Sequence, residues 1–234
     1  MSKYFRLSPT TFAADCQAAL ESYYGDGAII ESASGTTIIF KVPAVCDKVL
    51  KFVKTGGGVS AYIGDTSSSM KQLSYSYGGT ATEFHLILSE AFILVDTEST
   101  SSYRDSAFVA KLTNGRYMVA GGTVSSYSGT HCVNNKCCFT DTMVLRPIRF
   151  ICPYNIQAKS NGKLCLLPSF VADDQEVELN ADGTFASVPG MWLTTTTGSP
   201  VKGSNYYLSN SNLKGLETEG VYCYTQKYVE LDME

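Results

Sequence analysis

The chain has 234 residues, of which 44% are hydrophobic and only 17% charged, below the ~25% charged content that is usual for soluble domains. Its 18 basic and 22 acidic side chains give a formal net charge of −4, which argues against a nucleic-acid-binding protein because such proteins cluster Lys and Arg against phosphates. This length allows one large β domain or two small ones, and either can bury a core.

The first segment with a clear pattern is helical. Ser8 is a suitable N-cap residue and Pro9 suits the first helical position. Gly25 is a typical helix-ending residue. We therefore predict a helix over roughly 9–24. The apolar residues that share one face at helical spacing are Phe12, Cys16, Ala19, Leu20 and Tyr23.

The segments that follow have the pattern of short strands and turns. Residues 27–32 and 36–45 flank the short turn "ASG" and predict a hairpin. The segment "DKVLKFVKT" (47–55) fits a strand by its β-branched content and a short helix by its apolar spacing, so both alternatives stay open. Residues 56–65 predict a loop and a strand, and residues 70–80 a half-exposed strand that carries Leu73, Tyr75 and Tyr77 on one face.

The second half continues the pattern. "EFHLILSEAFILVDT" (83–97) predicts one or two buried strands. Residues 106–124 predict a hairpin around Asn114–Gly115, a pair suited to a type I′ turn, and Pro147 marks an edge or a bulge within 142–152. Further strands are expected within 163–172, 176–188, 190–198, 205–210 and 220–233, with a hairpin turn at Asp182–Gly183.

Short strands every 8–12 residues, separated by Gly, Asn, Asp and Ser, are typical of antiparallel sheets. The predicted fold class is mainly β, with antiparallel sandwich- or barrel-like modules and one N-terminal α-helix. The predicted domains are 1–80, the helix with a small β module, and 81–234, a larger antiparallel β module.

The N-terminus lacks the apolar core of a signal peptide, and the longest apolar run, "FHLILSEAFILVD", is far shorter than the ~20 residues of a membrane span. We therefore expect no membrane insertion and folding in a reducing cytoplasm. There, the eight cysteines are expected to be thiols or metal ligands rather than disulfides.

The segment "SGTHCVNNKCCFTDT" (128–142) concentrates metal-binding residue types. Zinc prefers four tetrahedral ligands, commonly from C-x₂-C knuckles. His131, Cys132, Cys137 and Cys138 instead form two adjacent pairs, and neighbours on a strand point to opposite faces. Two of them could bind zinc only if Cys152 or Cys165 completed the site. We predict packed thiols and no metal site.

The same segment contains the residue types for two other chemistries. A disulfide between Cys132 and Cys137 would suit facing hairpin positions, although the compartment disfavours it until release from the cell. A catalytic pair of His131 and Cys132 is disfavoured because the two side chains diverge on a strand. The second histidine, His85, lies in an apolar alternating run and is interpreted as a packed or edge-strand residue.

Acidic residues could in principle serve a glycosidase, which needs two carboxylates across a cleft. The candidates are Glu83, Glu90, Asp96, Asp173, Asp174, Glu176 and Glu178. The run "DDQEVE" alternates its carboxylates and is interpreted as a solvated strand face. "NADGT" (180–184) is interpreted as a hairpin turn, because it lacks the further acidic ligands of a calcium loop. "KTGGG" has its Lys before the glycines, the reverse of a phosphate-binding loop.

Tyrosines recur at period two in residues 75–77, 205–207 and 221–228, which suits protein interfaces and sugar stacking as well as ordinary sheet packing. The style of residues 84–234, in "AFILVDTESTSSYRDSAFVAKLTNGRYMVAGG" and "ELNADGTFASVPGMW", resembles structural proteins of bacteriophage virions, especially tail, neck and fibre-associated β proteins. The resemblance implies a part of an assembly, without catalysis or cofactor.

We therefore expect a non-enzymatic structural subunit of a phage virion or tail-like assembly, built in the bacterial cytoplasm. It would bind other virion proteins, and also copies of itself as a homo-oligomer. No catalytic, cofactor-binding or metal-binding residue is predicted, and no nucleic-acid partner. The alternative is a carbohydrate- or receptor-binding β module that contacts a host-surface glycan or receptor, and a cryptic hydrolase is the third possibility.

Overall fold

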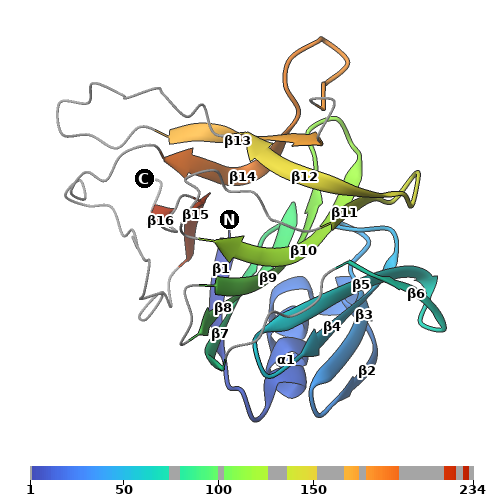
Figure 1. Cartoon of the computed structure of the whole chain (residues 1–234), viewed down its shortest axis with the longest axis vertical. Coiled ribbons are helices and arrows are strands. Elements are labelled where there is room, and N and C mark those ends of the chain that lie inside the picture. Colours follow the sequence, from blue (N-terminus) through green and yellow to red (C-terminus); the bar gives the residue numbers. More distant parts are fainter. Residues whose placement is uncertain are drawn as a thin grey trace.

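A computed structural model (Figure 1) describes residues 2–73, 80–99, 103–125, 136–151, 166–173, 178–194, 219–224 and 229–231. The elements are β1 Ser2–Leu7, α1 Phe12–Tyr24, η1 Gly25–Gly27 (a 3-10 turn), β2 Ile29–Ser34, β3 Thr37–Lys41, β4 Val49–Lys54, β5 Val59–Thr66, β6 Ser69–Gln72, β7 Ala81–Leu88, β8 Phe92–Ser99, β9 Tyr103–Lys111, β10 Tyr117–Ser125, β11 Lys136–Phe139, β12 Leu145–Ile151, β13 Leu166–Asp173, β14 Ser187–Thr194, β15 Glu219–Tyr224 and β16 Val229–Leu231. The predicted fold class, mainly antiparallel β with one helix near the N-terminus, is confirmed.

The larger sheet contains eleven of the described strands, in the order β1-β7-β8-β9-β10-β11-β12-β13-β14-β15-β16. Strand β15 also pairs with β1, with Gly220 opposite Ser2, so the strand order from β1 through β7–β15 returns to β1. Such closure removes unpaired sheet edges. Among the described pairings of this sheet, that of β14 with β15 is parallel.

The smaller sheet contains β2 to β6 in chain order, all antiparallel. The predicted hairpin over 27–45 is confirmed as β2–β3, and Gly35 in its turn has φ 57°. The ambiguous segment 47–55 forms strand β4, which pairs with β3 on one side and β5 on the other. Local propensity allows either a strand or a helix here, and hydrogen bonding to a strand on each side selects the strand.

The two sheets divide the chain near residue 80, apart from one strand. The small sheet uses residues before 80, whereas the large sheet uses later residues together with β1, which pairs with β7 from Lys3↔Leu88 to Leu7↔Phe84. Strand β1 was not predicted from the sequence, because six residues of mixed polarity directly before a helix give little pattern. The division into domains 1–80 and 81–234 stays a prediction.

Helix α1 begins at Phe12 instead of residue 9, so the predicted N-cap is wrong. Thr11 is the N-cap residue, and its carbonyl accepts the first helical hydrogen bond, from the Asp15 N–H at 2.9 Å. The Ser8 hydroxyl oxygen instead accepts the Thr10 N–H at 3.2 Å, within the turn before the helix. The predicted end is right: Gly25 terminates α1 with φ 54°, a conformation that suits glycine.

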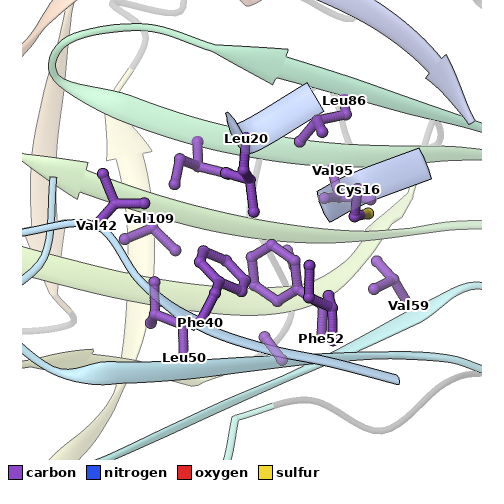
Figure 2. Packing of buried hydrophobic residues seen from close by; sticks show 14 of the residues in the cluster. Cys16, Leu20, Phe40, Val42, Leu50, Phe52, Val59, Leu86, Val95 and Val109 are labelled. Carbon is purple, nitrogen blue, oxygen red and sulfur yellow. The ribbon is translucent and has the colours of Figure 1, made fainter. Parts of the chain in front are cut away.

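A single hydrophobic cluster joins the helix and both sheets. It contains the predicted inner face of α1, with Cys16 and Leu20, together with Phe40 and Phe52 of the small sheet. Large-sheet residues such as Val95 belong to the same cluster. Figure 2 shows these side chains meeting between the strands of the two sheets. The cluster as a whole draws on β1, β3, β4, β5, β7, β8, β9, β10 and β11.

The hairpin of β9 and β10 is confirmed, with Tyr117 opposite Lys111, but its turn is not type I′. A type I′ turn needs positive φ at both central residues, whereas Gly115 has φ 82° and Asn114 is not in the positive-φ region. The Gly115 N–H donates to the Leu112 carbonyl at 2.9 Å, and the Leu112 N–H to the Arg116 carbonyl at 2.8 Å. The result is a three-residue loop that ends in a left-handed glycine.

Pro147 lies where strand β12 changes partner. Residues Leu145 to Pro147 pair with β11, and pairing with β13 begins only at Ile148. Pro147 therefore has a ladder partner, Lys136, on one side. This position is edge-like, as predicted. Pro147 pairs with a strand on one side only, so its missing N–H removes no hydrogen bond to a second strand.

Candidate functional site

A shallow depression lies where β1, the start of α1 and β7 meet. Its volume is about 350 Å³. The lining residues are Arg6, Leu7, Ser8, Pro9, Asp15, Thr82 and Glu83. It is the place in the described structure where one predicted carboxylate, Glu83, faces a concave surface.

The charged groups of this depression already have partners within the chain. The Arg6 guanidinium donates to Glu83 Oε1 at 2.5 Å. Asp15 Oδ2 accepts the Ser8 N–H at 2.7 Å and the Thr11 hydroxyl at 2.9 Å. These contacts join β1 to β7 and hold the turn before α1, so their role is to stabilise the fold.

His85 lies opposite Arg6 in the β1–β7 register and is fully buried, with 0% of its surface exposed. The Tyr4 hydroxyl and His85 Nδ1 are hydrogen-bonded at 2.7 Å, and His85 Nε2 lies 4.0 Å from Glu83 Oε2. Strand β7 lies between β1 and β8. The interpretation of His85 as a packed histidine is therefore confirmed, and the edge-strand alternative is wrong.

The described thiols are packed side chains. Burial raises the pKa of the Cys46 thiol to about 12 and also raises that of Cys16, with smaller electrostatic contributions. Cys138 is buried on β11 beside Met143, with 3.9 Å between the sulfurs, and burial raises its pKa too. A thiol held protonated is a poor nucleophile and a poor metal ligand.

Most of the cysteine-rich segment lies outside the described residues. This applies to His131 and Cys132, and to the proposed supplementary ligands Cys152 and Cys165. For Cys137 the backbone places it on β11 next to Cys138. In the part of the chain that the structure describes, no group of three or more metal-binding side chains occurs. The prediction of packed thiols is confirmed for Cys138 and stays a prediction for the others.

Of the remaining predicted carboxylates, none that the structure describes lines the depression. Glu90 is exposed in the turn between β7 and β8. Asp96 lies opposite His85 in the β7–β8 register, and Asp173 ends β13. Asp174 and Glu176 lie outside the described residues. Glu178 is half-buried and ion-paired, so its interpretation as part of a solvated face is wrong.

Glu178 belongs to a cluster around Arg116, a residue that no sequence pattern distinguishes. The guanidinium donates to both Asp141 oxygens at 2.9 Å and to Glu178 Oε1 at 2.6 Å. It also lies 4.1 Å from the centroid of the Phe139 ring. The Arg116 guanidinium lowers the pKa of Asp141 by hydrogen bonding and charge. The cluster ties the β9–β10 loop to the turn after β11 and to the segment before β14.

The β9–β10 loop also contacts a small hairpin formed by residues 178–187. Its turn is the predicted one at Asp182–Gly183: Gly183 has φ 80°, and Asp182 Oδ1 accepts the Thr184 N–H at 2.9 Å and the Thr184 hydroxyl at 2.6 Å. Because the Asp182 carboxylate and its neighbours bind within the turn, the reading of 180–184 as a hairpin turn rather than a calcium loop is supported. Thr113 binds the hairpin through its hydroxyl, 2.8 Å from Asn180 Oδ1.

Two large apolar side chains project from this hairpin into solvent. Leu179 and Phe185 form an isolated bridge, so they lie side by side on one face. Their exposed fractions are 49% and 51%. Val144, in the turn after β11, is also 49% exposed. We call residues 178–187, with Leu179 and Phe185 at their centre, the acidic hairpin.

The second accessible surface is the side of the small sheet that faces away from the core. Ile39, Lys51 and Tyr62 lie in register on β3, β4 and β5. Their sequence neighbours on each strand, such as Phe40 and Phe52, point into the core, so these three point outward, and all three are half-buried. We call this surface the open face. Ile29, Lys41, Val53 and Met70 also lie on this side. So do the polar residues Ser32, Thr37 and Gln72, and the buried residues Val49 and Ser60.

The comparisons with known proteins give no assignment: no protein-family model matches the sequence, and no curated protein matches it. Within the described residues, α1 is too short and too polar to cross a bilayer.

Proposed function

We propose that this chain is a non-enzymatic structural subunit of a homo-oligomeric assembly, of the phage virion or tail-like type that its sequence resembles. The observation that supports this proposal most directly is the Leu179–Phe185 pair. Two large apolar side chains are half exposed on a hairpin that is held firmly in place. Exposed apolar groups rimmed by polar residues are typical of protein–protein contact sites.

The hairpin is held by hydrogen bonds from a neighbouring loop. The Thr113 N–H donates to the Ser187 carbonyl at 2.9 Å, and the Ser187 N–H to the Thr113 hydroxyl at 3.0 Å. The Asn114 amide donates to the Leu179 carbonyl at 3.2 Å. A segment that is already ordered loses little conformational entropy when it binds. Solvent exposure of Leu179 and Phe185 is thus maintained by structure, as expected for a docking element.

The test is the size of the purified protein in solution. Sedimentation velocity and light scattering over a range of concentrations should show association beyond a monomer without any ligand, and electron microscopy should show particles of regular geometry. A chain that stays monomeric at every concentration would contradict the proposal. A monomer whose melting temperature rises with particular glycans would instead favour the alternative, a carbohydrate-binding module.

A further inference from the structure

The open face of the small sheet combines apolar and basic side chains. Lys51 Nζ lies 4.0 Å from the centroid of the Tyr62 ring, in line with Ile39 on the next strand. Lys41 lies opposite Ile29, which is 51% exposed. In the register of β3, β4 and β5 this side carries Lys41 and Lys51 and no carboxylate, while Glu31 lies exposed in the bulge of the edge strand β2. The open face therefore presents two ammonium groups among apolar and neutral polar side chains.

Asp65 lies at the end of β5 and does not offset these charges. Its carboxylate binds Lys48 Nζ at 2.5 Å, and this pairing lowers the pKa of Asp65. The carboxylate and that ammonium neutralise each other. The two lysines of the open face are separate from this pair, so the open face keeps its positive character.

The acidic hairpin has the opposite character. Glu178 and Asp182 lie on either side of the exposed Leu179–Phe185 bridge. Arg116 binds Glu178 and also Asp141, whereas the exposed Asp182 accepts hydrogen bonds within its own turn, from Thr184. Three carboxylates and one guanidinium therefore surround the apolar pair, and their formal charge is negative. The ammonium of Lys71 lies at the border of this region, where it donates to the Met143 carbonyl at 2.8 Å.

We propose that the acidic hairpin of one copy of this chain docks on the open face of a second copy. This inference rests on the proposed function, since it names the contact by which copies would associate. Both surfaces carry apolar groups to bury, and their charges are opposite, so each supplies what the other lacks. Leu179 and Phe185 would pack over Ile39 and Tyr62, with the hairpin carboxylates facing Lys41 and Lys51.

The contact is heterologous, because two different surfaces of the chain meet. A bound pair still has one free acidic hairpin, on one copy, and one free open face, on the other, so association continues head to tail until a ring closes or a filament grows. The described strand order of the large sheet closes through β15 and β1, whereas the open face presents half-buried and exposed side chains. Association through side chains on the open face is therefore the geometry that the fold offers.

The test uses two double variants, each altering one surface. In the sheet variant, Lys41→Glu and Lys51→Glu reverse the charge of the open face. In the hairpin variant, Leu179→Lys and Phe185→Lys replace the apolar pair by like charges. All four side chains are half-buried or exposed, so the fold should tolerate the changes, and circular dichroism melting checks this.

A matched control changes two lysines elsewhere. Lys3 and Lys111 also lie over aromatic rings, with 5.4 Å to the centroid of Phe5 and 5.6 Å to that of Tyr117. The Lys3→Glu, Lys111→Glu variant therefore matches the sheet variant in net charge and in the loss of a contact between an ammonium and a ring. It should associate like the wild type.

We expect the sheet variant and the hairpin variant each to remain monomeric in sedimentation velocity at concentrations at which the wild type associates. A mixture of the two should form complexes, because the native hairpin of the first can bind the native open face of the second. Should a double variant melt below the working temperature, the single variants Lys51→Glu and Phe185→Lys take its place.

The outcomes separate the two proposals. Variants that associate as the wild type does, or a mixture that stays monomeric when each variant is folded, would overturn the head-to-tail contact and leave the proposed assembly function intact. A wild type that never associates would contradict the proposed function itself. Loss of wild-type association at high salt would support the charge pairing, since exposed charges are screened.

Discussion

Replacing Phe52 by alanine tests whether the two sheets share one core. Phe52 is 1% exposed, and its ring lies 5.1 Å from that of Phe40 at an angle of 77°. Deleting a buried phenyl ring typically costs about 3–5 kcal/mol, because transfer free energy is lost and a cavity remains. The edge-to-face ring pair, worth about 0.5–1.5 kcal/mol, is lost as well. We therefore expect a loss near the upper end of the 3–5 kcal/mol range.

The assay combines urea unfolding with amide hydrogen exchange. Since the cluster around Phe52 includes large-sheet residues, the free energy of opening should fall equally for amides of β3–β5 and of β8–β10. Unchanged protection of β8–β10 beside weakened β3–β5 would refute this reasoning, and would show that residues 1–80 and 81–234 unfold independently. As a control, Phe185→Ala removes the same ring from a half-exposed position and should change stability by no more than about 0.5 kcal/mol.

Three further predictions address the loop, the ion pair and the thiols. Gly115→Val should lower the free energy of unfolding by about 1–3 kcal/mol in urea unfolding. Gly56→Val is the control and should not lower it. At both glycines an added Cβ would meet no atom within 4 Å, but of the two only Gly115 has a positive φ. Arg116→Gln should destabilise the protein at neutral pH. Because the guanidinium lowers the pKa of Asp141 from its usual 3.8, the difference from the wild type should shrink as the pH falls from about 5 to 2; an equal difference at both ends would contradict the pairing. Among the cysteines whose burial the structure describes, Cys16, Cys46 and Cys138 are buried and should react with a thiol reagent only on unfolding. All eight cysteines should titrate in the unfolded protein. Two fewer would indicate a disulfide, and stoichiometric zinc in protein purified without chelator would indicate a metal site within 128–142.

Much of the fold could be predicted because strand and helix periods are local properties. The alternation around Phe40 and the hairpin of β2 and β3 follow from neighbouring residues alone. The helix start could not be placed correctly, because Asp15, inside the helix, binds the backbone of Ser8 before it. The type of turn at Gly115 depends on the number of residues between the last paired positions, which tertiary pairing determines.

The surfaces were harder to predict than the fold. Arg116 binds Asp141 and Glu178, which lie 25 and 62 residues further along the chain, and no spacing rule relates partners so far apart. The open face had a local signal, since Lys51 and Val53 alternate with Leu50 and Phe52. That signal was obscured because the same residues also fit a short helix, and only pairing with β3 and β5 distinguishes the two.

The two sheets differ in what they leave available to partners. The large sheet returns to its own first strand through β15, so its backbone groups are largely used within the chain. The small sheet instead has two edges, β2 and β6, and an outer side on which Ile39, Lys51 and Tyr62 are partly accessible. Strand β2 carries a bulge between Ile30 and Ser32, and bulges at edges hinder further strand pairing. A partner that binds the small sheet is therefore expected to use its side chains rather than its edge. Contact through Lys51, Tyr62 and their neighbours gives copies a defined register while keeping uncontrolled strand addition unfavourable.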